Sequence, residues 1–546
     1  MKKVIIAFLS IAFFYCGNNV FACTNFLVGK AASADGSTII SYSADSHLLY
    51  GELYHWPAAV YPKGGILDIR EWDTRKFLGR IDQVERTYNV VGNINEHQLC
   101  IGETTFGGRH ELVDSTGIVD YGSLMFIALQ RSKTAREAMQ VMTDLVKEYG
   151  YHSSGESFSI ADPNEVWILE MIGKGPGRKG AVWVAVRLPD DCISGHANQS
   201  RIRTFSLKDK NNCIYSPDVI SFAREMGYFS GKDAEFSFAD AYAPEDFSAV
   251  RACEARVWSF FRKYDSNMDK YLPYLNGETK DRLPLWIKPN RKVSVQDVQS
   301  AMRDRFEGTD LDMTKDPGAG PFECPYRWRP MTYVIDGVEY FNERAVATQQ
   351  TGFSFTAQMR SWLPNEVGGV LWFGVDDVAS SVYVPMYCCM TETPLCFRAG
   401  NGDLLHYSPT SAFWIFNRVT NAAYGKYNYM IKDIQKVQRE LEISFSENQL
   451  TIEKTAVEMY LKDKAQAIAF LTDYSCKQAE STIERWRKLD EYLLVKYIDG
   501  NIKKEKDGKF ETDQNGSPVF PLQPGYSEEF YREIINKTGD KLRMKN

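Results

Sequence analysis

The chain has 546 residues, too many for one small core, and this length indicates one large domain with insertions or two to three domains. Hydrophobic residues make up 44% and charged residues 25%, as in an ordinary soluble globular protein. The net charge of −7 and the lack of a long basic run argue against nucleic-acid binding. Eleven cysteines are too few for a disulfide-built scaffold, although one or two disulfides remain open in an oxidising compartment.

The first 22 residues have the three parts of a signal peptide. Lys2 and Lys3 give a positive start, residues 4–14 form an apolar run, and Ala22 ends the segment at a suitable cleavage site. The segment predicts an exported protein, periplasmic or secreted. No later stretch reaches the roughly 18 apolar residues that span a membrane, so we expect no transmembrane segment in the mature chain.

Cleavage after Ala22 would make Cys23 the first residue of the mature chain, with a thiol and a free α-amine on one residue. An α-amine has a pKa near 7.7–8, so it can accept the thiol proton near neutral pH. The pattern favours a nucleophile with its own built-in base. Two alternatives stay open: a lipid-anchored cysteine, which the bulky Phe21 argues against, and a cysteine that follows the site by coincidence.

The first elements after Cys23 are predicted as a strand at 25–28, a turn at 34–37 and a strand at 38–40. Residues 88–105 predict a second hairpin. Thr134 and Glu137 form a capping box before a helix that Gly150 ends, and 121–130 is its expected partner helix.

Strands are expected again at 157–161, 165–172 and 181–187, then at 352–360, 369–375 and 381–385. Residues 175–180 match a dinucleotide-binding glycine pattern, but a strand follows them, so we predict a hairpin turn. The domain organisation predicted is a signal peptide at 1–22 and a main domain at 23–427 with an insertion at about 205–345. A charged helical region follows at 428–546, with helices for example at 431–443 and 451–464.

Other catalytic machinery is missing from the sequence. The seven histidines include no pair spaced for zinc, and there is no C-x-x-C pair, P-loop or G-x-S-x-G motif. We therefore expect neither a metal nor an organic cofactor. A Cys–His pair that uses Cys23 remains open.

Several motifs resemble those of the C69 dipeptidase family, whose members are N-terminal-nucleophile hydrolases related to bile salt hydrolases and penicillin V acylases. The matching segments run across most of the chain: Cys23 to Lys30, Asp35 to Ile40, Asp45-Ser46, Asn95-Glu96, Glu103-Thr104-Thr105, His196 to Ile202, and Gly369 to Trp372. The resemblance implies an α+β fold, namely an αββα four-layer sandwich of two antiparallel sheets with helices outside. It also implies hydrolysis of the amide bond in dipeptides or short peptides.

The resemblance also implies roles for particular residues. Cys23 would be the nucleophile and its amine the general base, Asp45 would hold that amine, and Asn198 would donate to the oxyanion. Thr105 falls near a second oxyanion-side position, and we assign it with Tyr42 to the substrate-binding side. Tyr42 stands where many relatives have arginine, and a tyrosine can only hydrogen-bond. Either another cation replaces the arginine, with Arg201 and Arg109 as candidates, or the Cys23 thiol is less acidic in this protein.

The sequence thus predicts a cysteine amidohydrolase that acts on short peptides through an acyl-enzyme on Cys23. A homo-oligomer is compatible with it. An acylase for N-acyl amides of the bile salt or penicillin V type would use the same residues. A peptide-binding surface lipoprotein, lipidated at Cys23, is the alternative without catalysis.

Overall fold

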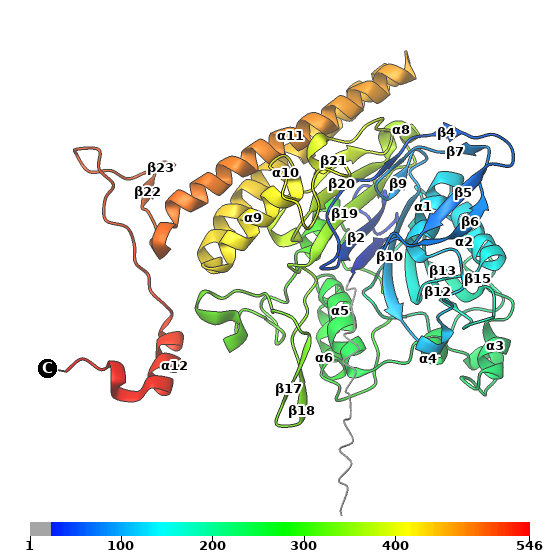
Figure 1. The fold of residues 1–546 in the computed structure, drawn as a ribbon, viewed down its shortest axis with the longest axis horizontal. Helices are drawn as coiled ribbons and strands as arrows, with labels where there is room; N and C mark the ends of the chain where they lie inside the picture. Colours follow the sequence, from blue (N-terminus) through cyan, green and yellow to red (C-terminus); the bar gives the residue numbers. More distant parts are fainter. Residues whose placement is uncertain (1–22, 546) are drawn as a thin grey trace, which may run out of the picture.

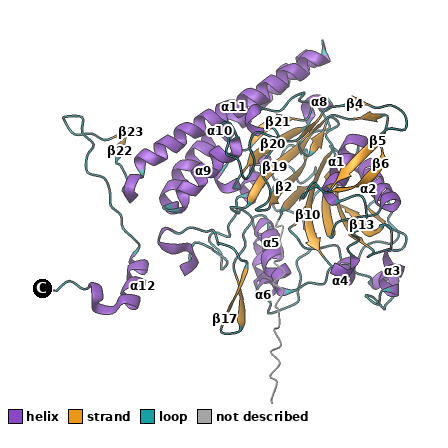
Figure 2. Ribbon diagram, in the orientation of Figure 1, coloured by secondary structure: helices purple, strands orange, loops and turns teal. Residues whose placement is uncertain are grey.

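The computed structural model describes residues 23–545 (Figure 1). The predicted signal peptide lies outside the described residues. Two antiparallel sheets form the centre of the described chain, and most helices lie around them (Figure 2). This mixture of helices and strands confirms the α+β class.

The first sheet has seven strands, and the N-terminal strand lies near its middle. In spatial order they are β16 (Trp286–Ile287), β14 (Ile193–His196), β1 (Asn25–Val28), β2 (Thr38–Asp45), β19 (Thr351–Met359), β20 (Val370–Val375) and β21 (Val384–Tyr387). The predicted hairpin is confirmed, since Leu27 pairs with Ile40 across β1 and β2. Strand β1 also pairs with β14, and Thr24 bridges to Ser43, so the chain next to Cys23 is bound on both sides.

The second sheet has eight strands. In spatial order they are β15 (Cys213–Tyr215), β13 (Ala181–Arg187), β12 (Val166–Gly173), β11 (Gly155–Ala161), β10 (Cys100–Gly107), β9 (Ile94–Asn95), β8 (Val90–Val91) and β3 (His55–Trp56). The glycine-rich segment 175–180 joins the antiparallel strands β12 and β13, as predicted. The second predicted hairpin contains three strands instead of two, because β9 pairs with both β8 and β10.

Helices pack on each sheet, and the sheets contact each other through β1 and β2 on one side and β10 and β11 on the other. The eight-stranded sheet packs against α1 (Tyr121–Arg131) and α2 (Ala135–Tyr149). The seven-stranded sheet packs against α5 (Ala255–Arg262), α7 (Val295–Met302), α9 (Ala412–Tyr424), α10 (Tyr427–Tyr460) and α11 (Lys464–Lys496) (Figure 1).

The predicted helix pair is confirmed in α1 and α2. The Thr134 hydroxyl accepts from the main-chain N–H of Glu137 at 3.3 Å, and Gly150 ends α2 with φ of 80°. The Glu137 carboxylate accepts from the main-chain N–H of Lys133 at 2.7 Å, one residue before the donor of a standard capping box. The side chains of Thr134 and Glu137 therefore both accept hydrogen bonds from main-chain N–H groups at the start of α2.

Residues 205–345, predicted as an insertion, contribute to both sheets through β15 and β16. They also hold α3 (Val219–Glu225), α4 (Phe238–Tyr242), α5, α6 (Leu272–Leu275) and α7. A hairpin of β17 (Thr332–Ile335) and β18 (Val338–Phe341) projects from the body (Figure 1). The domain boundaries remain predictions.

Small two-stranded sheets and a short helix lie outside this arrangement. They are β4 (Ala59–Val60) with β7 (Arg86–Thr87), β5 (Ile66–Arg70) with β6 (Phe77–Asp82), and α8 (Asn365–Gly368). Near the C-terminus, β22 (Glu505–Lys506) with β23 (Lys509–Phe510) and α12 (Glu528–Thr538) lie away from the sheets (Figure 1).

The C-terminal helices differ from those predicted. Residues 431–443 and the first part of 451–464 belong to the single helix α10, because the residues between them include no glycine or proline to break it. Helix α10 ends at Tyr460, and Asp463 caps the next helix by accepting from the N–H of Ala465 at 2.9 Å. The prediction thus placed a break where there is none and missed the real one.

Within residues 23–545, all ten cysteines are unpaired. No helix of this part is long and apolar enough to cross a membrane.

Candidate active site

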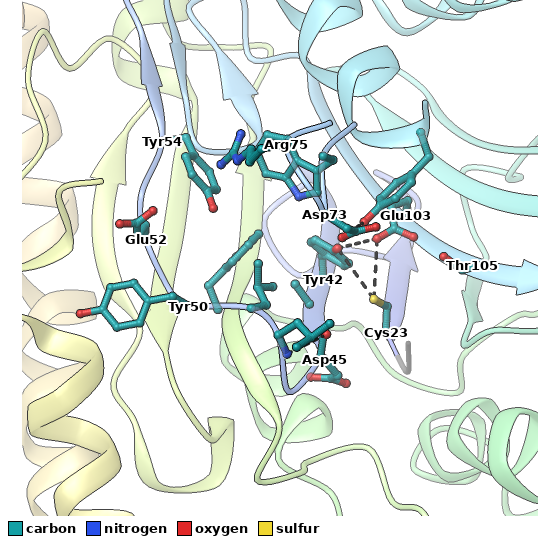
Figure 3. Close-up of a pocket in the computed structure, with 17 residues that line it drawn as sticks. Cys23, Tyr42, Asp45, Tyr50, Glu52, Tyr54, Asp73, Arg75, Glu103 and Thr105 are labelled. Atoms are coloured by element: carbon teal, nitrogen blue, oxygen red, sulfur yellow. Dashed lines mark hydrogen bonds between the residues drawn. The ribbon is translucent and has the colours of Figure 1, made fainter. Parts of the chain in front are cut away.

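Cys23 lies at one end of a cavity of about 180 Å³ (Figure 3). Its thiol lies 3.6 Å from Glu103 Oε1 and 3.8 Å from the Tyr42 hydroxyl. In the full-length chain, burial raises the pKa of this thiol well above its ordinary value, and the charges of Glu103 and Asp45 add to the effect. The thiol is therefore protonated at neutral pH and needs a base to become a nucleophile.

The cavity walls come from both sheets and from the loops that join their strands. The seven-stranded sheet supplies Tyr42, Asp45 and Phe353, Cys23 lies just before its strand β1, and the eight-stranded sheet supplies Glu103 and Thr105. Four of the five candidate residues from the sequence thus line one cavity. Other lining side chains are aromatic or charged: Tyr50, Glu52, Tyr54, Trp72, Asp73, Arg75 and Tyr121. Of these, Tyr50, Glu52 and Tyr54 lie on the side of the cavity away from Cys23 (Figure 3).

Asp45 ends strand β2 and is fully buried. Its carboxylate forms an ion pair with Arg344 at 2.6 Å, and it accepts from Thr351 at 2.6 Å and from Ser43 at 3.1 Å. A buried carboxylate needs a cation and hydrogen-bond donors, and Asp45 has both. The carboxylate is held rigidly at the cavity wall.

Asn198, the fifth candidate residue, does not line the cavity but is tied to it through Arg256 of α5. Arg256 donates to the Cys23 carbonyl at 2.6 Å and to Asn198 Oδ1 at 3.0 Å. The Asn198 amide nitrogen donates to the Thr105 carbonyl at 2.9 Å, so one of its two N–H groups remains for another acceptor. These bonds join Cys23 and the Asn198 amide in one buried network.

The loop that carries Asn198 is held by hydrogen bonds to Glu170 of β12. Its carboxylate accepts from the Ser200 hydroxyl at 2.5 Å and from the main-chain N–H groups of Arg201 and Ile202 at 2.6 and 3.2 Å. Asn198 itself has φ of 64°, a left-handed conformation that asparagine tolerates better than most residues. The loop around Asn198 is thus a turn held by hydrogen bonds, and it fixes the orientation of the Asn198 side chain.

A pair of buried glutamates lies beside Thr105. On β11, Glu156 pairs directly with Thr105 of β10, and the alternation of β10 places Glu103 on the same face. Thr105 donates to Glu156 Oε1 at 2.7 Å. Burial raises the pKa of Glu103 to about 7, and burial with the charge of Glu103 raises the pKa of Glu156 well above its ordinary value.

The predicted replacement cations are wrong. Arg201 forms a buried ion pair with Glu254 at 2.7 Å, and Arg109 donates to the Ala241 carbonyl at 2.7 Å and lies over the Tyr228 ring. Tyr42 donates to Glu103 at 2.5 Å, so its hydroxyl faces a carboxylate and is not an isolated packing group. No sequence pattern marked Arg256, which the fold brings to Cys23 from 233 residues away.

The histidine alternative has little support from the geometry. His196, in the same motif as Asn198, is fully buried, and its ring nitrogens lie 2.7 Å from the hydroxyls of Thr104 and Ser159. Burial lowers its pKa to about 3, so the ring is neutral and held by two hydroxyl partners. Within residues 23–545, no three His, Cys, Asp or Glu side chains are grouped to hold a metal ion.

Comparison with known proteins identifies the family of this chain. The model of peptidase family C69 matches residues 22–55 and 50–440. A probable dipeptidase of Salmonella dublin is 29% identical over 67% of this chain and 81% of its own length. One from Latilactobacillus sakei is 26% identical over 83% and 90%, and a probable dipeptidase B of Lactococcus lactis is 25% identical over 87% and 95%.

The site therefore belongs to a peptidase with a buried cysteine. The chain is a member of peptidase family C69.

Proposed function

We propose that this protein is an exported dipeptidase that cleaves dipeptides or short peptides through an acyl-enzyme on Cys23. The observation that carries the proposal is the position of the Cys23 thiol at the wall of a cavity, while the carbonyl of the same residue is linked through Arg256 to Asn198. The names of the relatives and the family match support the activity. The two facing sheets with outer helices are consistent with the αββα sandwich of N-terminal-nucleophile hydrolases.

In this mechanism the mature α-amine of Cys23 takes the thiol proton as the sulfur attacks the scissile carbonyl. A C–S bond forms, and the carbonyl oxygen becomes an oxyanion that the free N–H of Asn198 stabilises. The protonated amine then returns its proton to the leaving amino group as the C–N bond breaks. Water hydrolyses the thioester and regenerates the thiol.

The raised pKa of Cys23 supports a base within reach of the sulfur, because a protonated thiol is a poor nucleophile. The α-amine of the same residue meets this need without another side chain. Asp45 and Arg344 would fix the end of β2 next to this amine, and Arg256 would fix the Cys23 carbonyl. These three residues act by holding the nucleophile in one position.

The test is a mature protein with one extra, non-removable residue before Cys23. The thiol stays, but the amine becomes an amide nitrogen without basic character. General-base assistance is worth about 10²–10⁴ in rate, so dipeptide hydrolysis should fall by at least about 10²-fold, as it should in Cys23→Ala. Mass spectrometry must show that the extra residue is retained.

A native rate in the extended protein would mean that another group is the base and would contradict the proposal. The intact mass of the mature protein also separates the alternatives. A lipid adduct on Cys23 with a blocked amine would support the surface lipoprotein, whereas an N-acyl amide acylase would show the free amine and cleave N-acyl substrates instead of dipeptides.

A further inference from the structure

Glu103 is an acidic side chain in contact with the reacting sulfur, and no side-chain cation of residues 23–545 pairs with it. It is 1% exposed and lines the cavity beside Cys23. Its Oε1 accepts from the Tyr42 hydroxyl at 2.5 Å and from the Cys23 thiol at 3.6 Å. Among residues 23–545, no arginine, lysine or histidine forms an ion pair with it, whereas the buried Asp45 has Arg344.

The second oxygen of Glu103 receives no hydrogen bond from the hydroxyl, amide or cationic groups of the described chain, and the same holds for Oε2 of Glu156. Burial and the charge of Glu103 raise the pKa of Glu156 well above its ordinary value, so Glu156 is protonated at neutral pH. Burial raises the pKa of Glu103 to about 7, so Glu103 carries a negative charge above about this pH.

A buried charge of this kind is costly unless a cation pairs with it. A cation can reach Glu103 from the cavity, because Glu103 forms part of the cavity wall. A cavity of about 180 Å³ is large enough for a single amino-acid residue, since about 150 Å³ accommodates a benzene ring. The cation should therefore belong to a small group that lies close to the sulfur.

The geometry of peptide attack identifies this group. An attacked carbonyl carbon lies about 3–3.5 Å from the nucleophile. The α-nitrogen of the same residue is two bonds further on, about 2.5 Å from that carbon. An ammonium at this distance can donate to an oxygen that lies 3.6 Å from the sulfur, as Glu103 Oε1 does.

We infer that Glu103 binds the α-ammonium of the residue whose carbonyl Cys23 attacks, so that the enzyme selects peptides with a free N-terminal amine and releases one residue. Tyr42 is a positioning residue that orients the Glu103 carboxylate. The inference rests on the proposed attack by Cys23. It separates this site from an N-acyl amide acylase, whose substrates carry no charged amine next to the scissile carbonyl.

The experiment compares alanyl-alanine with propionyl-alanine, which differ only in the α-amine. Sites built to bind a polar group reject the analogue that lacks it by large factors. The wild-type protein should therefore prefer alanyl-alanine by at least about 10²-fold in kcat/KM. In Glu103→Gln this preference should shrink to within about tenfold, mainly through a higher KM for alanyl-alanine, while kcat/KM for propionyl-alanine stays within a few-fold.

Glu85→Gln is the matched control, because Glu85 is exposed, lies outside the cavity lining and loses the same charge. It should keep the wild-type preference. If the wild-type protein shows no preference, or if Glu103→Gln slows both substrates equally, Glu103 does not recognise the substrate amine and the inference is wrong. The wild-type comparison needs no variant, so it holds even if Glu103→Gln folds poorly.

The acyl-enzyme separates this failure from failure of the proposed function. Intact mass after rapid quenching should show an alanyl or propionyl adduct on Cys23. An adduct without amine preference would overturn the inference and leave the function standing. Peptide hydrolysis that persists in Cys23→Ala would overturn both.

Discussion

Two carboxylates lie near Cys23, and they differ in their partners: one is paired with an arginine, and the other has no side-chain cation among the described residues. Asp45 on the seven-stranded sheet is neutralised by Arg344 and receives two hydroxyl donors. Glu103 on the eight-stranded sheet accepts from one hydroxyl and one thiol and has no side-chain cation among the described residues. A fully paired buried charge holds structure, whereas an unpaired one at a cavity wall is available to a ligand.

Asp45→Asn should have the largest effect on stability, because it leaves the buried Arg344 without its counter-charge. Breaking one half of a buried ion pair costs about 3–5 kcal/mol. Glu103→Gln should cost less than about 1 kcal/mol or stabilise the fold, because it removes a charge that has no cation. Urea unfolding of both variants measures the difference, and an equal loss in both would contradict the comparison.

Asn198→Ala should lower kcat by about 10²–10³, or roughly 2.7–4 kcal/mol, because it removes an oxyanion donor. The oxyanion forms with or without a substrate amine, so the loss should be the same for alanyl-alanine and propionyl-alanine. The equal loss distinguishes Asn198→Ala from Glu103→Gln, which should slow hydrolysis of alanyl-alanine only. Near-normal kcat in a folded variant would remove Asn198 from the mechanism.

The pH dependence should also distinguish the two substrates. Burial raises the pKa of Glu103 to about 7, so its carboxylate binds an ammonium above this pH and loses it below as the carboxylate is protonated. The ratio of kcat/KM for alanyl-alanine over propionyl-alanine should therefore fall up to about tenfold per pH unit below pH 7. Titration of the Cys23 amine affects both substrates and cancels in this ratio.

Tyr42→Phe tests whether Glu103 causes this pH dependence. The Tyr42 hydroxyl donates to the ionised Glu103 and lowers the pKa of that carboxyl, so its loss should raise this pKa and move the fall of the kcat/KM ratio to higher pH. A ratio that does not change with pH would mean that Glu103 is not the titrating group.

The parts of the site that the sequence predicted are those with local patterns. Cys23 follows a signal-like segment, and the helix after Thr134 has a cap, a periodic apolar face and a glycine stop. The Asn198 turn was found through a family motif. Each of these features depends on neighbours within a few residues, so it can be read from a short stretch.

The parts that the sequence missed depend on distant partners. Arg256 and Arg344 lie in the region that the sequence indicated only as a mixed insertion, and only the fold shows that they meet Cys23 and Asp45. The closeness of Glu103 and Glu156 depends on the register of β10 and β11. Arg201 was a candidate cation for the site, but its side chain pairs with Glu254.

The Arg256 bridge also sets the order in which this enzyme can become active. The thiol-bearing residue is among the first of the mature protein to be synthesised, while the arginine that ties it to Asn198 follows 233 positions later. Contacts with so large a separation form late, because a long loop must close first. In a nascent or truncated chain Cys23 is therefore not yet tied to Asn198, and under the proposed mechanism hydrolysis would begin only once α5 has docked.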